Sequence, residues 1–226
     1  MIFPSLDRVK AIAPGYDIVP VYMEILSDVR TPISVLKALK QVSSHTYLLE
    51  SADNSNHWGR YSFLGYDPKI ELFCKNHKMT IKDGTTRTFE CSDPAAEIRN
   101  ILSQYKSPRL EELPTFTGGF VGYFACEYIR YIEPTLDFPT PDDDSAMVND
   151  VDLMLFDKVI AFDHYKNKIY LIANISTNDL ERNYNKAELE LKVLADLVVN
   201  GKEADIPKGI LKTEFTSEFT KDEFEE

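Results

Sequence analysis

YLLESADNSNHWGRYSFLG, residues 47–65, contains two apolar arms that are joined by a polar connection. The first arm, residues 47–49, is apolar and leads directly into Glu50, whereas residues 60–64 alternate polar and apolar side chains. Such alternation is typical of a half-buried strand. The Asn-rich segment 52–57 is typical of a surface loop. The stretch therefore predicts a β-hairpin.

Glu50 and Arg60 place opposite charges at facing ends of the two predicted strands. A carboxylate that follows two Leu residues is partly desolvated and needs a partner. Arg60 could form a surface ion pair with it, an interaction that contributes little energy. Alternatively, the two charges bracket a zwitterion: Glu50 binds its ammonium group, Arg60 its carboxylate, and Trp58, Tyr61 and Phe63 its apolar side chain. Spacing alone leaves both interpretations open.

Composition argues against several classes of partner. The 226 residues are enough for one good core or two small ones. A net charge of −12 argues against nucleic-acid binding and against an anionic membrane surface. No apolar run approaches the length of a transmembrane helix, and residues 1–10 lack the apolar core of a signal peptide. We therefore expect a cytoplasmic protein without nucleic-acid or membrane partners.

The cysteines and histidines do not form a recognisable metal or disulfide pattern. The three cysteines, Cys74, Cys91 and Cys126, are odd in number and contain no Cys-x-x-Cys pair. The four histidines are scattered along the chain. The carboxylate triplet at residues 142–144 lacks the spacing of a calcium loop, so it is interpreted as solvated. The sequence predicts no metal site.

The remaining segments predict an α+β fold. Strands are expected at residues 17–26 (an edge strand, from its Pro20), 69–74, 79–82, 85–90, 118–124, 152–163 and 168–175. Helices are expected after Thr31-Pro32, after Asp93-Pro94 and from a capping box of Asn178 and Glu181 to Gly201. We expect mainly antiparallel sheets, arranged like a two-layer sandwich, with three or four helices.

The glycines of residues 118–122 do not have the spacing of a phosphate-binding loop, and no Lys-Ser or Lys-Thr pair follows them. We interpret them instead as positions where another backbone approaches a strand closely. No nucleophile with a partnered base is evident in the sequence, so the chain itself is not expected to be catalytic.

Four motifs in order resemble the N-terminal region of anthranilate synthase component I. The first is Val19-Pro20-Val21-Tyr22 with Thr31-Pro32, and the second is Leu48-Leu49-Glu50-Ser51 with residues 59–65. The third is residues 118–123 with Ile129-Arg130, and the fourth is Phe162-Asp163-His164. The resemblance covers nearly all of residues 18–226.

The resemblance implies a regulatory domain that binds L-tryptophan as a feedback inhibitor. Glu50 and Ser51 match the family's tryptophan site, and Arg60 stands where the family has a basic residue. The intact enzyme, a lyase of tryptophan biosynthesis, would convert chorismate and glutamine or ammonia to anthranilate and pyruvate. It would require Mg²⁺ and a glutamine amidotransferase subunit, component II. The fragment itself would hold no cofactor.

The resemblance also implies the domain boundaries: an extension at residues 1–16, the regulatory domain at 17–215, and the start of the chorismate-binding catalytic domain at 216–226. Thr220 and Glu223 form a second predicted capping box that opens a helix shortly before the chain ends, so we expect a truncated protein. Two alternatives stay open: the corresponding domain of aminodeoxychorismate synthase, a folate-pathway enzyme, and a non-catalytic binding or scaffold domain.

Overall fold

The computed structural model describes residues 1–28, 30–50, 59–133, 135, 148–205, 209, 212, 217 and 220–225. The elements are, in chain order, α1 (Leu6–Ile12), β1 (Ile18–Leu26), α2 (Pro32–Leu39), β2 (Thr46–Glu50), β3 (Tyr61–Tyr66), β4 (Ile70–Lys75), β5 (Lys78–Lys82), β6 (Thr86–Glu90), α3 (Pro94–Leu102), β7 (Gly119–Phe124), the 3-10 helix η1 (Cys126–Tyr128), α4 (Ile129–Ile132), β8 (Val151–Phe156), β9 (Lys158–Asp163), β10 (Lys168–Ser176), α5 (Leu180–Asn200) and α6 (Lys221–Glu225).

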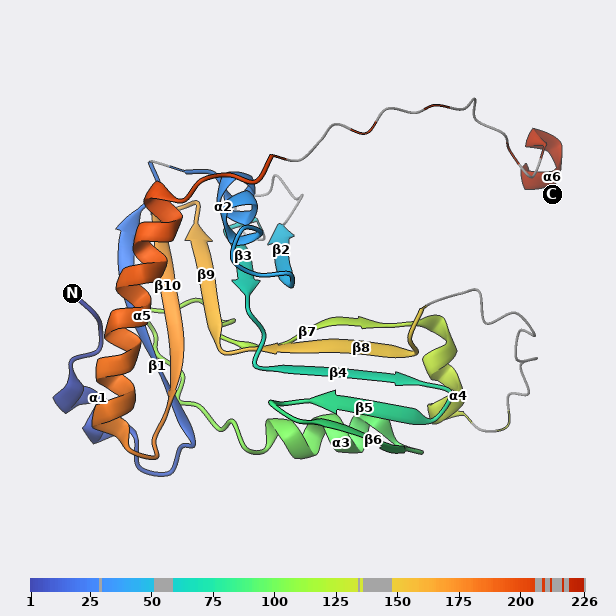
Figure 1. The fold of residues 1–226 in the computed structure, drawn as a ribbon, viewed down its shortest axis with the longest axis horizontal. Coiled ribbons are helices and arrows are strands. Elements are labelled where there is room, and N and C mark those ends of the chain that lie inside the picture. The colour runs from blue at the N-terminus through green and yellow to red at the C-terminus, as the bar shows by residue number, and fades with distance from the viewer. Residues whose placement is uncertain are drawn as a thin grey trace.

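The strands form two antiparallel five-stranded sheets, which confirms the predicted α+β class (Figure 1). Sheet A has the order β1-β10-β9-β3-β2, and sheet B the order β6-β5-β4-β8-β7. Strand β1 lies at an edge of sheet A, as Pro20 predicted. The described residues contain six α-helices, more than predicted, because the short helices α1, α4 and α6 are added to α2, α3 and α5.

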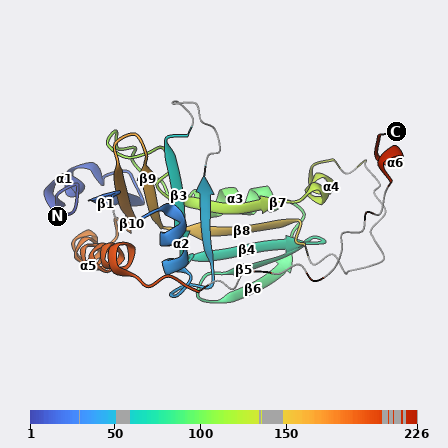
Figure 2. The same cartoon turned by 90° about the horizontal axis from the view of Figure 1, so that it is seen from above.

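Each sheet is covered by helices on one face (Figures 1 and 2). Helix α5 lies along sheet A and buries one stripe of side chains against it: Tyr184, Ala187, Leu191, Leu194 and Val198. Helix α3 packs against sheet B through Ile98. The two sheets therefore have separate apolar cores, and a third cluster of buried residues covers the other face of sheet A.

Residues 152–163 were predicted as one strand, and this prediction is wrong. Residues up to Phe156 form β8 in sheet B, whereas β9 begins at Lys158 in sheet A. At the break, the Asp157 carbonyl accepts hydrogen bonds from the backbone N–H of Asn174 (2.9 Å) and from its side-chain amide (3.1 Å). The same amide also donates to the Thr117 carbonyl at 2.7 Å. These contacts fix the point where the chain passes between sheets, and they depend on residues that are remote in sequence.

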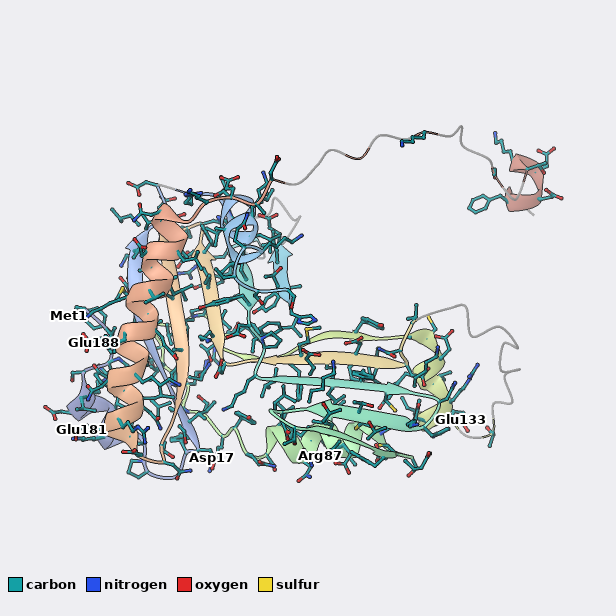
Figure 3. The ribbon with its side chains drawn as sticks, in the orientation of Figure 1. Met1, Asp17, Arg87, Glu133, Glu181 and Glu188 are labelled. Carbon is teal, nitrogen blue, oxygen red and sulfur yellow. The ribbon has the colours of Figure 1, made fainter. Side chains whose placement is uncertain are left out.

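The predicted capping box of Asn178 and Glu181 is not formed. The N-cap of α5 is Asp179, which has a positive φ of 54° and makes no capping side-chain bond. Glu181 instead forms an ion pair with Lys10 of α1 at 3.1 Å, and Figure 3 shows Glu181 at the end of α5 beside α1. The Glu181 side chain thus forms an ion pair with another helix and does not make the capping-box hydrogen bond that the sequence predicted. By contrast, Thr31, Asp93 and Thr220 cap their helices as predicted.

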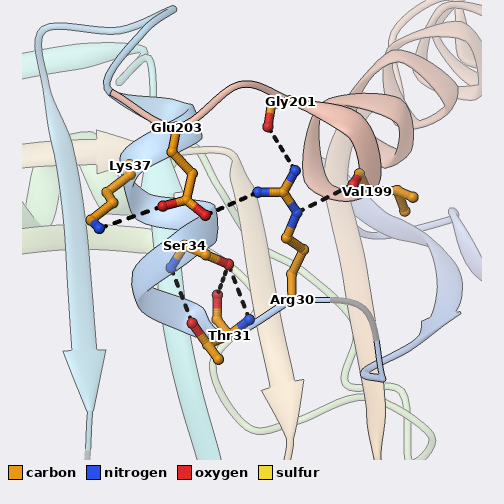
Figure 4. Close-up of polar contacts among 7 residues, drawn as sticks. All are labelled: Arg30, Thr31, Ser34, Lys37, Val199, Gly201 and Glu203. Atoms are coloured by element: carbon orange, nitrogen blue, oxygen red, sulfur yellow. Dashed lines mark hydrogen bonds and ion pairs between the residues drawn. The ribbon is translucent and has the colours of Figure 1, made fainter. Parts of the chain in front are cut away.

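Arg30 ties the end of α5 to the start of α2 (Figure 4). Its guanidinium donates to the carbonyls of Val199 (3.2 Å) and Gly201 (2.8 Å), and it pairs with Glu203 at 3.3 Å. Lys37 of α2 pairs with the other carboxylate oxygen of Glu203 at 3.4 Å. Carbonyls at a helix C-terminus have no partner within the helix, and a cation there also interacts favourably with the helix dipole.

We expect Arg30→Ala to lower the free energy of unfolding by about 1–2 kcal/mol, because charge-assisted bonds to two helix-terminal carbonyls are lost. Urea denaturation followed by circular dichroism measures the change. Arg182→Ala is the matched control, since this side chain is 84% exposed and pairs only weakly with Asp179 at 3.7 Å. Equal effects of the two substitutions would contradict a stabilising role for the Arg30 contacts.

Candidate functional site

The predicted hairpin is confirmed. Strands β2 and β3 pair antiparallel, with Glu50 directly opposite Ser62. Glu50 is exposed at the end of β2, an edge strand of sheet A, and its side-chain carboxylate makes no hydrogen bond or ion pair with another described residue. The predicted site residue Ser51, the loop 52–57 and Trp58 lie outside the described residues.

Arg60 does not pair with Glu50; its partner is Asp163 at the end of β9. Arg60 Nε donates to Asp163 Oδ1 at 3.0 Å, and Nη2 donates to Oδ2 at 2.7 Å. The guanidinium also lies over the rings of Tyr61 (4.8 Å) and Tyr165 (5.6 Å). Its Nη1 has no acceptor among the residues that the structure describes. The ion pair between Glu50 and Arg60, one of the two interpretations of the sequence, is therefore not present.

Asp163 is a fully buried carboxylate, with 0% of its surface exposed. Besides Arg60, it accepts hydrogen bonds from the backbone N–H groups of Tyr165 and Lys166, both at 3.1 Å. Burial alone would raise the pKa of Asp163, but the bonds from Arg60 and from these backbone groups outweigh it and hold the pKa below its usual value. The bonds fix the turn between β9 and β10, which contains His164.

Ser62 and His164 form a contact that the sequence did not predict. Ser62 Oγ and His164 Nε2 lie 2.7 Å apart, and the imidazole is stacked on Phe162 with 6.4 Å between ring centres. Ser62 is buried, whereas His164 is exposed. Both residues belong to motifs that the sequence analysis singled out, but no pattern along the chain indicated that residues 62 and 164 meet.

Strand register divides these groups between the two faces of sheet A. Glu50, Ser62 and Phe162 are opposite one another on β2, β3 and β9, and Phe162 belongs to the core beneath α2 and α5. Tyr61 and Asp163 form the adjacent row. Neighbouring rows face opposite sides of a sheet. Glu50 thus shares its face with Ser62 and His164, whereas Arg60 turns toward the row of Tyr61 and Asp163.

A separate apolar hollow lies where the two sheets meet, with about 450 Å³ of space that includes part open to solvent. Its lining is formed by Ile18, Leu102, Tyr105, Ser107, Thr117, Gly118, Gly119, Leu155, Phe156, Asp157 and Asn174. Neither Glu50 nor Arg60 belongs to it. Phe63, one of the aromatics expected around a ligand, packs edge-to-face on Phe116 at 5.5 Å, with its row on the face opposite Glu50.

Metal ligands do not cluster within the described part of the chain, in which no three His, Cys, Asp or Glu residues are placed to hold an ion. Residues 142–144, the carboxylate triplet, fall outside it. Cys74, Cys91 and Cys126 are free thiols, two of them buried. Among the described helices, none is both long and apolar enough to cross a membrane.

Comparison with known proteins finds similar chains that share one description. Anthranilate synthase component 1 of Acetivibrio thermocellus is 36% identical over 197 residues, which cover 86% of this chain and 39% of that protein. The proteins of the same description from Acinetobacter calcoaceticus and Aquifex aeolicus are 39% and 32% identical, covering 81% and 98% of this chain and 37% and 45% of theirs. The chain thus spans less than half the length of these relatives.

No family model matches the chain. Among solved structures, anthranilate synthase component I from Streptococcus pneumoniae is similar, with 26% sequence identity and a TM-score of 0.45, over 74% of this chain and 36% of that one.

Proposed function

Because this chain belongs by sequence to the anthranilate synthase component I family, we propose that it is the regulatory, tryptophan-sensing N-terminal domain of such an enzyme. In this proposal the domain comprises residues 17–215. The observation that carries it is Glu50, an exposed carboxylate that ends a strand of the Leu-Leu-Glu-Ser motif and has no partner among the described residues.

The site proposed for L-tryptophan comprises Glu50, Ser51 and Arg60. Glu50 binds the ammonium group, since an unpaired carboxylate is an acceptor for a charge-assisted hydrogen bond. Ser51 follows it directly in the sequence and supplies a hydroxyl. Arg60 contributes its remaining nitrogen, Nη1, since Nε and Nη2 are bonded to Asp163. To inhibit, tryptophan must bind one arrangement of the enzyme more tightly than another.

The chemistry of the proposed enzyme belongs to the part of the family that this chain does not span. The intact enzyme would convert chorismate and glutamine or ammonia to anthranilate and pyruvate, with Mg²⁺ in its catalytic domain. Its partners would be that catalytic domain and a glutamine amidotransferase subunit. In this proposal the chain contributes regulation only, and no catalytic role is assigned to its residues.

We expect the chain alone to bind L-tryptophan weakly, with a dissociation constant of about 1 mM or higher, because part of the pocket lies outside it. Two-dimensional NMR of the ¹⁵N-labelled chain, titrated with L-tryptophan and with L-leucine as control, measures this. A micromolar affinity by calorimetry would contradict the incomplete pocket, and equal shifts with both amino acids would contradict tryptophan sensing.

Glu50→Gln tests the ammonium contact, and it should weaken L-tryptophan binding about tenfold, because a charged acceptor is replaced by a neutral one. Glu90→Gln is a matched control, since Glu90 is likewise an exposed residue at the end of an edge strand, β6. The Glu90 variant should bind as the unmodified chain does.

A further inference from the structure

We propose that His164 is a further ligand-binding residue of this site and that its imidazole, held by Ser62, binds the carboxylate of the amino acid. The inference rests on the proposed function. It differs from the zwitterion interpretation of the sequence, which gave the carboxylate of the ligand to Arg60.

The position of His164 is the first observation that supports this proposal. His164 is on the same face of sheet A as Glu50, as its stacking on Phe162 and its contact with Ser62 show. Ser62 lies directly opposite Glu50, where side chains on neighbouring strands are about 4.5–5.5 Å apart at Cβ. A small zwitterion whose ammonium group contacts Glu50 therefore has the imidazole within reach, one strand further into the sheet.

The second supporting observation is that the charge of Arg60 is already paired. Arg60 is bonded through two nitrogens to a buried carboxylate, so the pair is close to neutral as a unit and attracts a second carboxylate only weakly. The guanidinium is also drawn toward Tyr61 and Tyr165, away from the face of Glu50. Arg60 therefore stabilises the carboxylate of a ligand beside Glu50 less than the spacing of Glu50 and Arg60 in the sequence predicted.

The third supporting observation is the hydrogen-bond capacity of the His164 imidazole. The Ser62 hydroxyl can donate its single proton to His164 Nε2, and the neutral imidazole then carries its proton on Nδ1. His164 is exposed, and its Nδ1 is without a partner in the part of the chain that the structure describes. An N–H donor held in this way suits a carboxylate.

The surroundings hold the imidazole in place. The His164 backbone N–H donates to the Arg60 carbonyl at 2.9 Å, and Asp163 accepts from the next two backbone N–H groups of the turn. Arg60 fixes Asp163 in turn. Through this chain of contacts, Arg60 is a positioning residue for His164 as well as a member of the site.

The test is an NMR titration of the chain with three probes: L-tryptophan, tryptamine, which lacks the carboxylate, and indole-3-propionate, which lacks the ammonium group. We expect the imidazole ¹⁵N signals of His164 to shift with L-tryptophan and indole-3-propionate but not with tryptamine. His164→Ala should weaken L-tryptophan binding about fivefold to tenfold and leave tryptamine binding unchanged. His45→Ala, which removes a partly exposed histidine elsewhere, is the control.

Three results would overturn the inference. If L-tryptophan binds equally to the chain and to the His164→Ala variant, His164 has no part in a site that otherwise exists, and the proposed function stands. If His164→Ala weakens tryptamine binding as much as L-tryptophan binding, the imidazole does not recognise the carboxylate. If L-tryptophan produces no saturable shifts up to its solubility limit, both this inference and the proposed function fail.

Discussion

Arg60→Met is expected to lower the free energy of unfolding by about 3 kcal/mol. The substitution removes the only cation bonded to Asp163 among the described residues and leaves a fully buried carboxylate with two backbone donors. An uncompensated buried charge typically costs about 3–5 kcal/mol, and the lower end applies because the Arg60 side chain is 36% exposed. Urea denaturation at pH 7 measures the change.

Two further variants show whether charge causes the loss. Asp163→Asn in the Arg60→Met background should restore about 1–2 kcal/mol, because the neutral amide oxygen still accepts the two backbone bonds. Arg87→Met, which breaks an exposed pair with Asp83, should have little effect. If the double variant is no more stable than Arg60→Met, the lost packing of the Arg60 stem, and not the unpaired carboxylate, explains the effect.

The ion pair between Arg60 and Asp163 also makes the stability of the protein depend on pH in the acidic range. Because the folded-state pKa of Asp163 lies below its value in the unfolded chain, the stabilisation is complete above about pH 4. It is lost as the pH falls further, through the folded-state pKa. The stability difference between the unmodified chain and Asp163→Asn should therefore shrink below about pH 4.

Gly122→Ala is expected to cost about 3 kcal/mol by separating β7 from β8. A Cβ atom on Gly122 would collide with the Asp152 carbonyl oxygen and would lie 2.9 Å from Leu153 Cα. Both are backbone atoms of the paired strand, which can yield only by breaking ladder hydrogen bonds. Overpacking in a core costs about 1–3 kcal/mol even where side chains can adjust, so the upper end applies here.

Thermal denaturation of Gly122→Ala is compared with that of Gly209→Ala, where an added Cβ meets no atom within 4 Å. The control should melt as the unmodified chain does. Hydrogen exchange should locate the damage in β7 and β8, with sheet A unaffected. Uniformly faster exchange in both sheets would show that the two sheets unfold as one cooperative unit.

The fold class and most elements could be predicted because their causes are local. An apolar run identified β2 and alternation identified β3. Pro20 indicated an edge strand, and Thr31-Pro32 began a helix through bonds that span three residues. Among the glycines of residues 118–122, the interpretation is confirmed for Gly118 and Gly122, because an added Cβ on either would lie against backbone atoms. The alternation and the helix cap depend on neighbours within a few positions along the chain, whereas Gly122 was recognised by its residue type although the backbone it meets, at Asp152, is remote in sequence.

The site was predicted only in part. The sequence predicted that Glu50 and Arg60 are the charged residues of one hairpin, and the structure contains this hairpin. It did not indicate that Asp163 would bind Arg60, or that His164 would meet Ser62, because these pairs are 103 and 102 residues apart. Opposite charges at facing strand ends predict a pair only when no better-buried carboxylate competes.

By itself, the sequence determined the antiparallel hairpins, the helix caps at Thr31, Asp93 and Thr220, and the family, since each depends on residue order and short-range spacing. The tertiary structure decided where residues 152–163 break between two sheets, which carboxylate binds Arg60, and which imidazole shares a face with Glu50. The physical reason is the same in all three cases. Strand register and burial act between segments that the chain brings together only when it folds, and buried polar groups then take whichever partners are in reach.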